Sequence, residues 1–368
     1  MPEAPTLSLR ELNRATLARQ LLLRREPLGP LEAIERLVSL QAQFPKPPYT
    51  GLWTRVERFE RRHLTKLITD QRVVRATMMR HTLHLIGSRD YALLRMTVQP
   101  ALTRSFGSIA GKRMAGVDMD GLLGLAAREL SEHPRTFAEL RVTLAAAYPD
   151  RDPSAMGYAV RTFLPLVQLP SGAEHGYPAI PQFTLAGDFL SEPLAAAGQE
   201  RALIRRYLAA FGPAAVRDIQ AWSGLSGLKL AADQMRDELM TFRDESGREL
   251  LDLDDAPRPP ADTPAPARFL PDFDNLIVGH ADRTRIIADE HRRKVSLPAA
   301  VVRATFLLDG FVAGTWKLER AKGAVTLVIE PFGRLTRAQR DELAAEGDRL
   351  VTFLEPDRAV VVRFETPR

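Results

Sequence analysis

The chain has 368 residues, which is long enough for several packed units. Its composition, 45% hydrophobic and 26% charged, is that of a globular protein and excludes wholesale disorder. It contains no cysteine, so disulfides, thiolate zinc sites and cysteine nucleophiles are excluded. The formal net charge is +5 and most basic residues are arginines, which permits a nucleic-acid partner without requiring one. Neither a signal peptide nor an apolar run of about 18 residues occurs, so we expect a cytoplasmic protein without a membrane partner.

The first third of the chain predicts helices followed by a hairpin. Ser8 and Glu11 have the spacing of a capping box and predict a helix over residues 9–25. Apolar residues at helical spacing predict a second helix that leads into residues 41–43. The next predicted elements are helices near 51–58 and 64–71 and strands over 73–79 and 81–86. This order is typical of a winged-helix unit, which we assign to residues 1–118.

The same order recurs twice and predicts a second unit over residues 119–195 and a third over 196–254. In the second unit, Thr136 and Glu139 form another capping box. Its predicted elements are helices over 122–130, 137–147 and 154–164 and strands over 166–169 and 182–185. The third unit is predicted to contain helices over 200–211, 214–222 and 228–240 and strands over 241–243 and 249–253, joined by a turn at 244–247. Three copies in register favour the winged-helix interpretation more than one copy would.

The last quarter of the chain changes character. Residues 255–267 contain five prolines and predict an extended linker. Asp309-Gly310 is a hairpin turn signal. The other predicted elements are strands over 300–308, 311–318, 324–329 and 358–364 and one helix over 337–354. We therefore assign residues 255–368 to a linker and a small β-domain, and the predicted fold class is α+β, with three tandem winged-helix units before that domain.

Gln41 and Gln43 form the first candidate site. At a frayed helix end, both amides can turn toward one pocket, and each offers donors and an acceptor while staying neutral at every pH. The alternative is that they cap nearby backbone in a proline-rich loop. The residues alone leave both interpretations open.

Metal binding is not expected. His81 and His84 stand three apart on a predicted strand, so their side chains point to opposite faces and do not chelate one ion. Asp272 and Asp274 are the only candidate carboxylate pair near the expected channel, and their spacing fits a structural turn equally well. We therefore expect neither a metal nor another cofactor.

Four stretches together resemble the bacterial AlkZ-like winged-helix DNA glycosylases, in the order found in that family. They are residues 40–55, 80–84, 211–224 and 270–283. The resemblance extends over residues 7–364. It implies winged helices wrapped as a C around a basic channel that the β-domain closes. It also implies a catalytic motif of glutamine, apolar residue and glutamine, which falls on Gln41, Ala42 and Gln43.

The implied chemistry agrees with neutral amides. A purine alkylated at N7 or N3 is positively charged, so its glycosidic bond is already activated and the base leaves as a neutral molecule. No strong general acid is needed, and the site has only to place a water beneath C1′ and tolerate a sugar cation. The expected partner is double-stranded DNA with alkylated purines, bound by a monomer in the bacterial nucleoid.

The resemblance also implies where DNA is bound. The candidate DNA-binding residues are Arg80, His81, His84, Asn275, His280, Asp282, Arg283, Arg285, Arg292, Arg293 and Lys294. The last three follow His291 in a basic run that we expect at a hairpin tip. The alternatives are that the histidines pack the hairpin, that residues 275–285 form a salt-bridged corner, and that the basic run is a solvated surface.

Two rival functions use the same sequence features. A transcription regulator would explain winged helices, but three copies with an added β-domain exceed what a repressor needs. A metal-dependent nuclease would need paired carboxylates. Sequence preference without base release would indicate the regulator, and EDTA sensitivity would indicate the nuclease.

Overall fold

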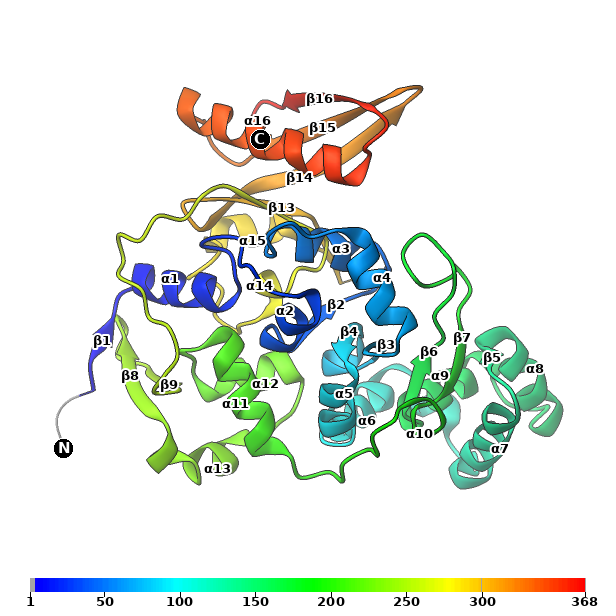
Figure 1. Cartoon of the computed structure of the whole chain (residues 1–368). Helices are drawn as coiled ribbons and strands as arrows, with labels where there is room; N and C mark the ends of the chain where they lie inside the picture. Colours follow the sequence, from blue (N-terminus) through cyan, green and yellow to red (C-terminus); the bar gives the residue numbers. More distant parts are fainter. Residues whose placement is uncertain (1–3, 299, 368) are drawn as a thin grey trace.

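The computed structural model describes residues 4–298 and 300–367 and places the C-terminal sheet above a row of helical units (Figure 1). Within these residues, no helix is long and apolar enough to cross a membrane. The first unit consists of α2 (Pro30–Arg36), β2 (Ser39–Gln41), α3 (Pro47–Trp53), α4 (Arg61–Thr69), β3 (Val73–Thr77) and β4 (Leu83–Gly87). The second consists of α7 (Met119–Glu132), β5 (Arg135–Thr136), α8 (Phe137–Ala147), α9 (Pro153–Phe163), β6 (Leu166–Gln168) and β7 (Gln182–Leu185).

These two units share one sheet. In each unit the short first strand pairs with the last strand, and the last pairs with the middle one, always antiparallel. The middle strands β3 and β6 then pair with each other at Ala76 and Val167. The result is a six-stranded sheet in the order β2-β4-β3-β6-β7-β5, with β2 at one edge. Two helices not predicted from the sequence, α5 (Ser88–Leu94) and α6 (Gln99–Ile109), follow the hairpin of the first unit.

The third unit repeats the order with a reduced first strand. It consists of α11 (Glu200–Phe211), α12 (Val216–Ser223), α13 (Leu228–Asp233), β8 (Met240–Asp244) and β9 (Glu249–Asp252). A single bridge between Ala214 and Leu251 stands where the first strand would be. The N-terminal strand β1 (Thr6–Leu7) completes the sheet by pairing in parallel with β8.

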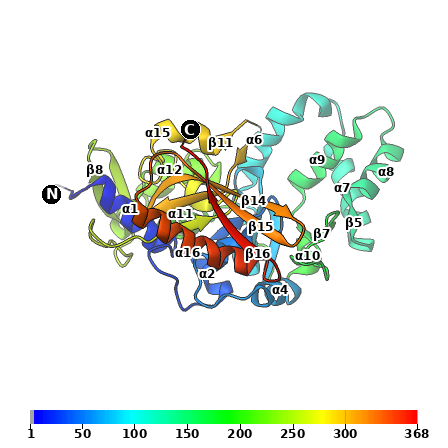
Figure 2. The same cartoon turned by 90° about the horizontal axis from the view of Figure 1, so that it is seen from above.

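The C-terminal part is a five-stranded sheet covered by one helix. Its order is β10-β13-β14-β15-β16. The strands are β10 (Arg268–Leu270), β13 (Thr305–Leu308), β14 (Phe311–Ala321), β15 (Ala324–Pro331) and β16 (Ala359–Phe364), and the helix is α16 (Arg337–Leu354) (Figure 2). Asp309 and Gly310 turn the β13–β14 hairpin with φ of 47° and 82°, as the Asp-Gly signal predicts. Between β10 and β13 lie α14 (Asn275–Val278), α15 (Asp289–Val295), β11 (Ser296–Leu297) and β12 (Val301–Val302).

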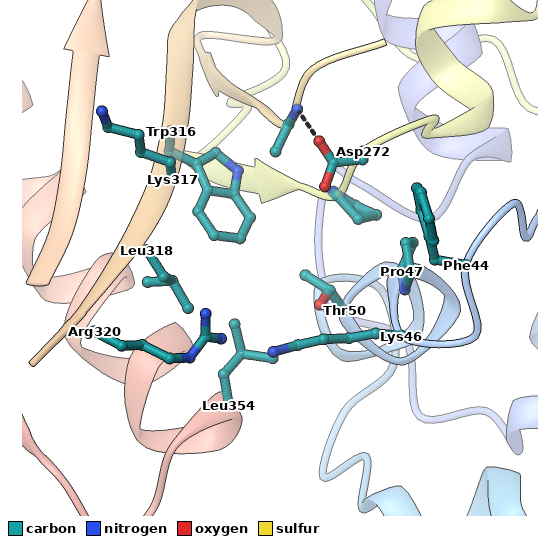
Figure 3. Close-up of a pocket in the computed structure, with 12 residues that line it drawn as sticks. Phe44, Lys46, Pro47, Thr50, Asp272, Trp316, Lys317, Leu318, Arg320 and Leu354 are labelled. Carbon is teal, nitrogen blue, oxygen red and sulfur yellow. Dashed lines mark hydrogen bonds between the residues drawn. The ribbon is translucent and has the colours of Figure 1, made fainter. Parts of the chain in front are cut away.

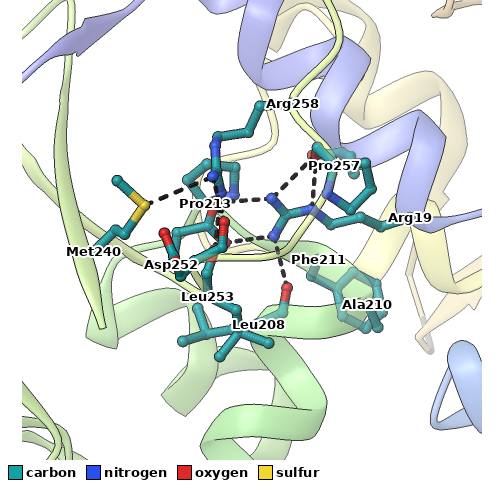
Figure 4. A network of polar contacts seen from close by, with 12 residues as sticks. Arg19, Leu208, Ala210, Phe211, Pro213, Met240, Asp252, Leu253, Pro257 and Arg258 are labelled. Atoms are coloured by element: carbon teal, nitrogen blue, oxygen red, sulfur yellow. Dashed lines mark hydrogen bonds and ion pairs between the residues drawn. The ribbon is translucent and has the colours of Figure 1, made fainter. Parts of the chain in front are cut away.

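Helix α1 (Leu9–Arg19) connects the third unit to the C-terminal part. Its buried Arg19 binds both carboxylate oxygens of Asp252, at 2.6 and 2.8 Å, and the carbonyl of Leu208 at 2.8 Å (Figure 4). At the other end, Asn13 donates to the carbonyl of Gly310 at 2.8 Å. The capping box of Ser8 and Glu11 that begins this helix is confirmed.

Several predicted elements differ from the structure. The helix expected to lead into the glutamines ends at Arg36, because Val38 takes a left-handed φ of 65° and the chain continues as β2. The helix expected over 51–58 begins at Pro47 instead, since proline is well suited to the first turn of a helix. The helix expected over 9–25 stops at Arg19, followed by the left-handed Leu21.

The basic run at 291–294 is also placed differently from the prediction. It lies on helix α15 and not at a hairpin tip. Asp289 and Glu290 occupy the first turn of this helix, and the basic residues occupy its last turn. This charge order favours a helix because it complements the helix dipole.

Candidate active site

The glutamine pair lies at the β2 edge of the shared sheet. Gln41 is the last residue of β2 and pairs with His84 on β4. Ala42 continues the ladder by donating its N–H to the carbonyl of Leu83 at 2.7 Å. Residues 41–46, which we call the glutamine loop, then lead into α3. The glutamines therefore occupy the end of a strand, whereas the sequence predicted the frayed end of a helix.

Both amide oxygens bond to the β3–β4 hairpin. The Oε1 of Gln41 accepts from Nη2 of Arg80 at 3.0 Å, and the Oε1 of Gln43 accepts from the backbone N–H of Leu83 at 2.8 Å. Because both partners are donors, they fix which end of each amide is the oxygen. Among the described residues, neither Nε2 donates a hydrogen bond to a protein acceptor. The backbone-capping alternative therefore holds for the oxygen of Gln43.

Arg75 fixes the backbone of the glutamine loop. It is 5% exposed and lies in the middle of β3. Its guanidinium donates to the carbonyls of Ala42 and Gln43, both at 2.8 Å, and to Oε1 of Gln168 at 2.5 Å. Burial lowers the pKa of Arg75 to about 10, so the group stays charged at neutral pH. The sequence analysis missed this residue, although an arginine inside the otherwise apolar strand was a signal.

Arg80 connects the first glutamine to the third unit. It stands at the tip of the β3–β4 hairpin with a left-handed φ of 53°. Besides Gln41, its guanidinium bonds to the carbonyl of Trp222 at 2.5 Å. Gly224 lies against its backbone, since a Cβ on that glycine would be 3.4 Å from the Arg80 nitrogen. Burial, reinforced by the charge of Arg283, lowers the pKa of Arg80 to about 10.

The two hairpin histidines bind protein groups. The ring nitrogens of His81 lie 3.0 Å from the hydroxyl of Tyr158 and 3.1 Å from that of Thr162, both on α9. Those of His84 lie 3.0 Å from Ser39 Oγ and 2.9 Å from Thr82 Oγ1. Burial lowers the pKa of His81 to about 4 and of His84 to about 3, so both rings are neutral. His84 is fully buried, and its contact with DNA stays a prediction.

The segment from Asn275 to Arg285 is tied closely to the same site. Asn275 binds β2 on both sides, donating to the Ser39 carbonyl and accepting from the N–H of Gln41 at 3.3 Å. His280 bonds to the carbonyl of Phe211 at 2.9 Å, and burial lowers its pKa to about 3. Arg285 donates to the carbonyl of Pro213 at 2.8 Å.

These three residues are 2–3% exposed. They therefore hold the segment against β2 and the third unit, and their contact with DNA stays a prediction, as for His84. Asp282 accepts a hydrogen bond from Arg248 at 2.8 Å.

The remaining cations lie nearer the surface. Arg283 is half-buried and contacts Ser296 Oγ at 3.3 Å. Burial and the charge of Arg292 lower its pKa, so these two cations lie close together. On α15, Arg292 is 41% exposed and pairs with Asp289 at 3.0 Å. Lys294 lies over the ring of Phe332 at 5.1 Å.

The candidate carboxylates are used by the protein itself. Both oxygens of Asp274 bind the guanidinium of Arg55, at 2.7 and 2.8 Å, in a fully buried pair. Asp272 accepts from the N–H of Ala304 at 3.0 Å. No group of three or more potential metal-ligating side chains occurs among residues 4–298 and 300–367.

A cavity of about 330 Å³ opens beside the glutamine loop, between α3 and strand β14 (Figure 3). Phe44, Lys46 and Pro47 line it on the loop side, and Trp316 and Arg320 face them from β14. The ammonium of Lys46 lies 3.9 Å from Glu355, and its side chain is 38% exposed.

The solved structure of the Streptomyces sahachiroi DNA glycosylase AlkZ superimposes with a TM-score of 0.80, covering 98% of this chain and 100% of that chain at 22% identity. The chain therefore shares the fold of that protein. Together with the family match over most of its length, this fold places the chain in the class of DNA glycosylases.

The chain belongs to the family described as DNA glycosylase AlkZ-like, which matches residues 34–353. It is also 26% identical to the interstrand DNA cross-link repair glycosylase of Streptomyces sahachiroi, over 82% of this chain and 84% of the relative.

Proposed function

We propose that this DNA glycosylase removes purines that carry a positive charge after alkylation at N7 or N3, and that Gln41 and Gln43 are its catalytic residues. The observation that carries the proposal is the orientation of the two amides. Arg80 and Leu83 hold their oxygens, so both amide nitrogens are directed away from the hairpin with fixed geometry. Each oxygen also keeps a second lone pair.

These groups are suited to holding a nucleophilic water. The water oxygen attacks C1′, the bond between C1′ and N9 breaks, and its electron pair neutralises the positive charge of the purine. The proton of the water is released to solvent. Neutral amides are sufficient because the leaving base needs no proton, and fixed dipoles cost no reorganisation during the reaction. The product is an abasic site, without a covalent enzyme intermediate.

We further propose that the three repeated units are winged helices, over residues 1–118, 119–195 and 196–254, which curve around the duplex as a C. The linker and β-domain, residues 255–368, would close the channel. The recurrent element order and the strand pairing within each unit support this assignment. The monomeric state expected from the sequence is part of the same proposal.

The proposed DNA contacts come from the accessible cations. Arg283, Arg292, Arg293 and Lys294 would hold phosphates, and Arg80 would lie between them and the glutamines. The buried residues His84, Asn275, His280 and Arg285 would act by positioning these groups. His81 and Asp282 would stabilise the hairpin tip and the segment from 275 to 285.

The substrate range is proposed to include bulky adducts and interstrand crosslinks. The support is the relative named as an interstrand DNA cross-link repair glycosylase, which aligns with most of this chain. A crosslink joined through purine N7 presents the same activated bond as a methylated purine. In this proposal the protein repairs alkylated DNA, including the DNA of a cell that makes an alkylating natural product.

Base release from a defined duplex tests the proposal. The protein is incubated with a duplex that contains one N7-methylguanine, and abasic sites are then cleaved with alkali. We expect one strand break at the lesion, none in the undamaged duplex, and no effect of EDTA. Binding of the damaged duplex without base release would contradict the proposal.

A further inference from the structure

We propose that the cavity between α3 and β14 binds one nucleotide that has left the duplex stack beside the lesion, with its base between Phe44 and Trp316 and its phosphate at Lys46 and Arg320. The inference rests on the proposed function, because it supplies a second nucleotide site next to the glutamine loop. The size fits, since ligand sites commonly enclose about 300–1,000 Å³, and this cavity encloses about 330 Å³.

Two aromatic side chains form opposite walls of the cavity. Trp316 is 9% exposed, and its Nε1 donates to the carbonyl of Leu270 at 2.9 Å, which fixes the plane of the indole. In Figure 3 the indole is directed toward the space between β14 and α3. Phe44, across the cavity, is 61% exposed and has Phe273 as its ring neighbour at 6.3 Å. Aromatic faces of this kind stack bases of any sequence.

Two cations at the rim of the cavity share a single carboxylate. Arg320 and Lys46 share the carboxylate of Glu355, at 2.8 and 3.9 Å. Burial lowers the pKa of Lys46, and the charge of Arg320 lowers it further. Lys317 lies on the opposite face of β14, 3.1 Å from Glu319 and 3.7 Å from Glu330, and does not face the rings. A phosphate beside Arg320 would supply the missing negative charge.

One carboxylate lies among the apolar walls and would read the base. Asp272 uses Oδ1 to accept the N–H of Ala304, and its buried position raises the pKa of its carboxyl group. A base edge with N–H donors would satisfy its remaining acceptor capacity. Aromatic walls, a cationic rim and an acceptor together match a nucleotide better than they match a purely apolar group.

The cavity lies between the glutamine loop and the basic helix α15. Phe44 follows Gln43 directly in the chain. On the opposite side, Lys317 also lines a neighbouring cavity of about 450 Å³ together with Lys294 of α15. DNA held by α15 with its lesion at the glutamines would therefore pass the opening of this cavity.

Photocrosslinking tests the proposal without measuring excision. Duplexes carry a non-hydrolysable 2′-fluoro analogue of N7-methylguanosine and one 5-iodouracil, placed opposite the lesion or at a neighbouring step. Irradiation followed by peptide mass spectrometry should identify a crosslink to Phe44 or Trp316 from at least one position. The same duplexes should bind roughly fivefold or more weakly to Phe44→Ala and to Arg320→Ala, as the loss of base stacking or of a phosphate contact predicts. Val361→Ala and Arg337→Ala remove an exposed apolar side chain and an exposed cation that do not line the cavity, and they should bind like the wild type.

The outcomes separate this inference from the proposed function. If the protein binds and excises N7-methylguanine normally but no crosslink maps to Phe44 or Trp316, the nucleotide site is wrong and the function stands. If these crosslinks form only with single-stranded oligonucleotides, extrusion from the duplex is wrong. If Phe44→Ala slows excision of an N7-benzylguanine but not of N7-methylguanine, and no crosslink forms, the cavity holds the substituent of the lesion instead of a nucleotide.

Discussion

Replacing Gln43 by alanine should affect catalysis far more than stability. The substitution removes the hydrogen bond between Oε1 and the N–H of Leu83, which is only partly buried. A bond of this kind contributes about 0.5–1.5 kcal/mol to the free energy of unfolding. Losing one interaction with the transition state costs about 2–4 kcal/mol, or a factor of roughly 10²–10³ in rate. Single-turnover excision of N7-methylguanine and urea unfolding therefore measure the two effects separately.

The protein provides a matched control in Gln339. Its Oε1 accepts the backbone N–H of Thr336 at 2.9 Å, so it has the same bonding role as Gln43 at a distant site. Gln339→Ala should lower the free energy of unfolding by a similar amount and leave excision unchanged. Gln43→Asp keeps an acceptor and adds a charge that stabilises a sugar cation, so it should retain more activity than Gln43→Ala. Wild-type excision rates in both Gln41→Ala and Gln43→Ala would refute the assignment of the site.

Four further predictions concern other groups. Arg75→Lys should slow single-turnover excision at least tenfold with little change in DNA affinity, because a lysine cannot hold both carbonyls of the glutamine loop; an unchanged rate would exclude the positioning role. Arg292→Ala combined with Arg293→Ala should weaken DNA binding and reduce the slope of log K against log salt by about 1.8, at about 0.9 per phosphate contact; an equal slope would mean that α15 does not touch DNA. Burial lowers the pKa of His84 to about 3, so below about pH 6.5 the unfolded chain takes up a proton that the folded protein does not. The free energy of unfolding should therefore decrease as the pH is lowered, by up to about 1.4 kcal/mol per pH unit. Urea unfolding measured between about pH 7 and pH 5 should show a weaker pH dependence in His84→Gln. Borohydride should trap no covalent complex through Lys46, and a trapped adduct would indicate a Schiff base.

The sequence predicted best those elements whose signals are local. Helices over 137–147, 200–211 and 337–354 match the structure to the residue, and two of the three begin with a capping box. The hairpin at Asp309 and Gly310 also matches. In each case the residues that define the element lie within it, so no knowledge of distant contacts was required.

The elements around the site depend on distant contacts, and the sequence predicted them less well. Val38 has no local reason to take a left-handed conformation, since β-branched residues disfavour it. It does so because β2 pairs with β4, which follows some forty residues later in the chain. Arg75 is explained only by the carbonyls that it meets after folding. The glutamines themselves were found through a family resemblance, because their amide bonds to Arg80 and Leu83 cannot be read from spacing.

The position of α1 has a consequence for the order in which the protein is completed during synthesis. Arg19 and its partner Asp252 are 233 residues apart in the chain, and Arg14 and its partner Asp309 are 295 apart. The ribosome therefore releases this helix long before the groups that bury its arginines exist. Domains generally fold as units while the rest of the chain is made, so the first two units can form their shared sheet while α1 waits. Its docking is then a late, long-range event that joins the third unit to the C-terminal sheet, and the first helix to be translated is among the last to be fixed in place.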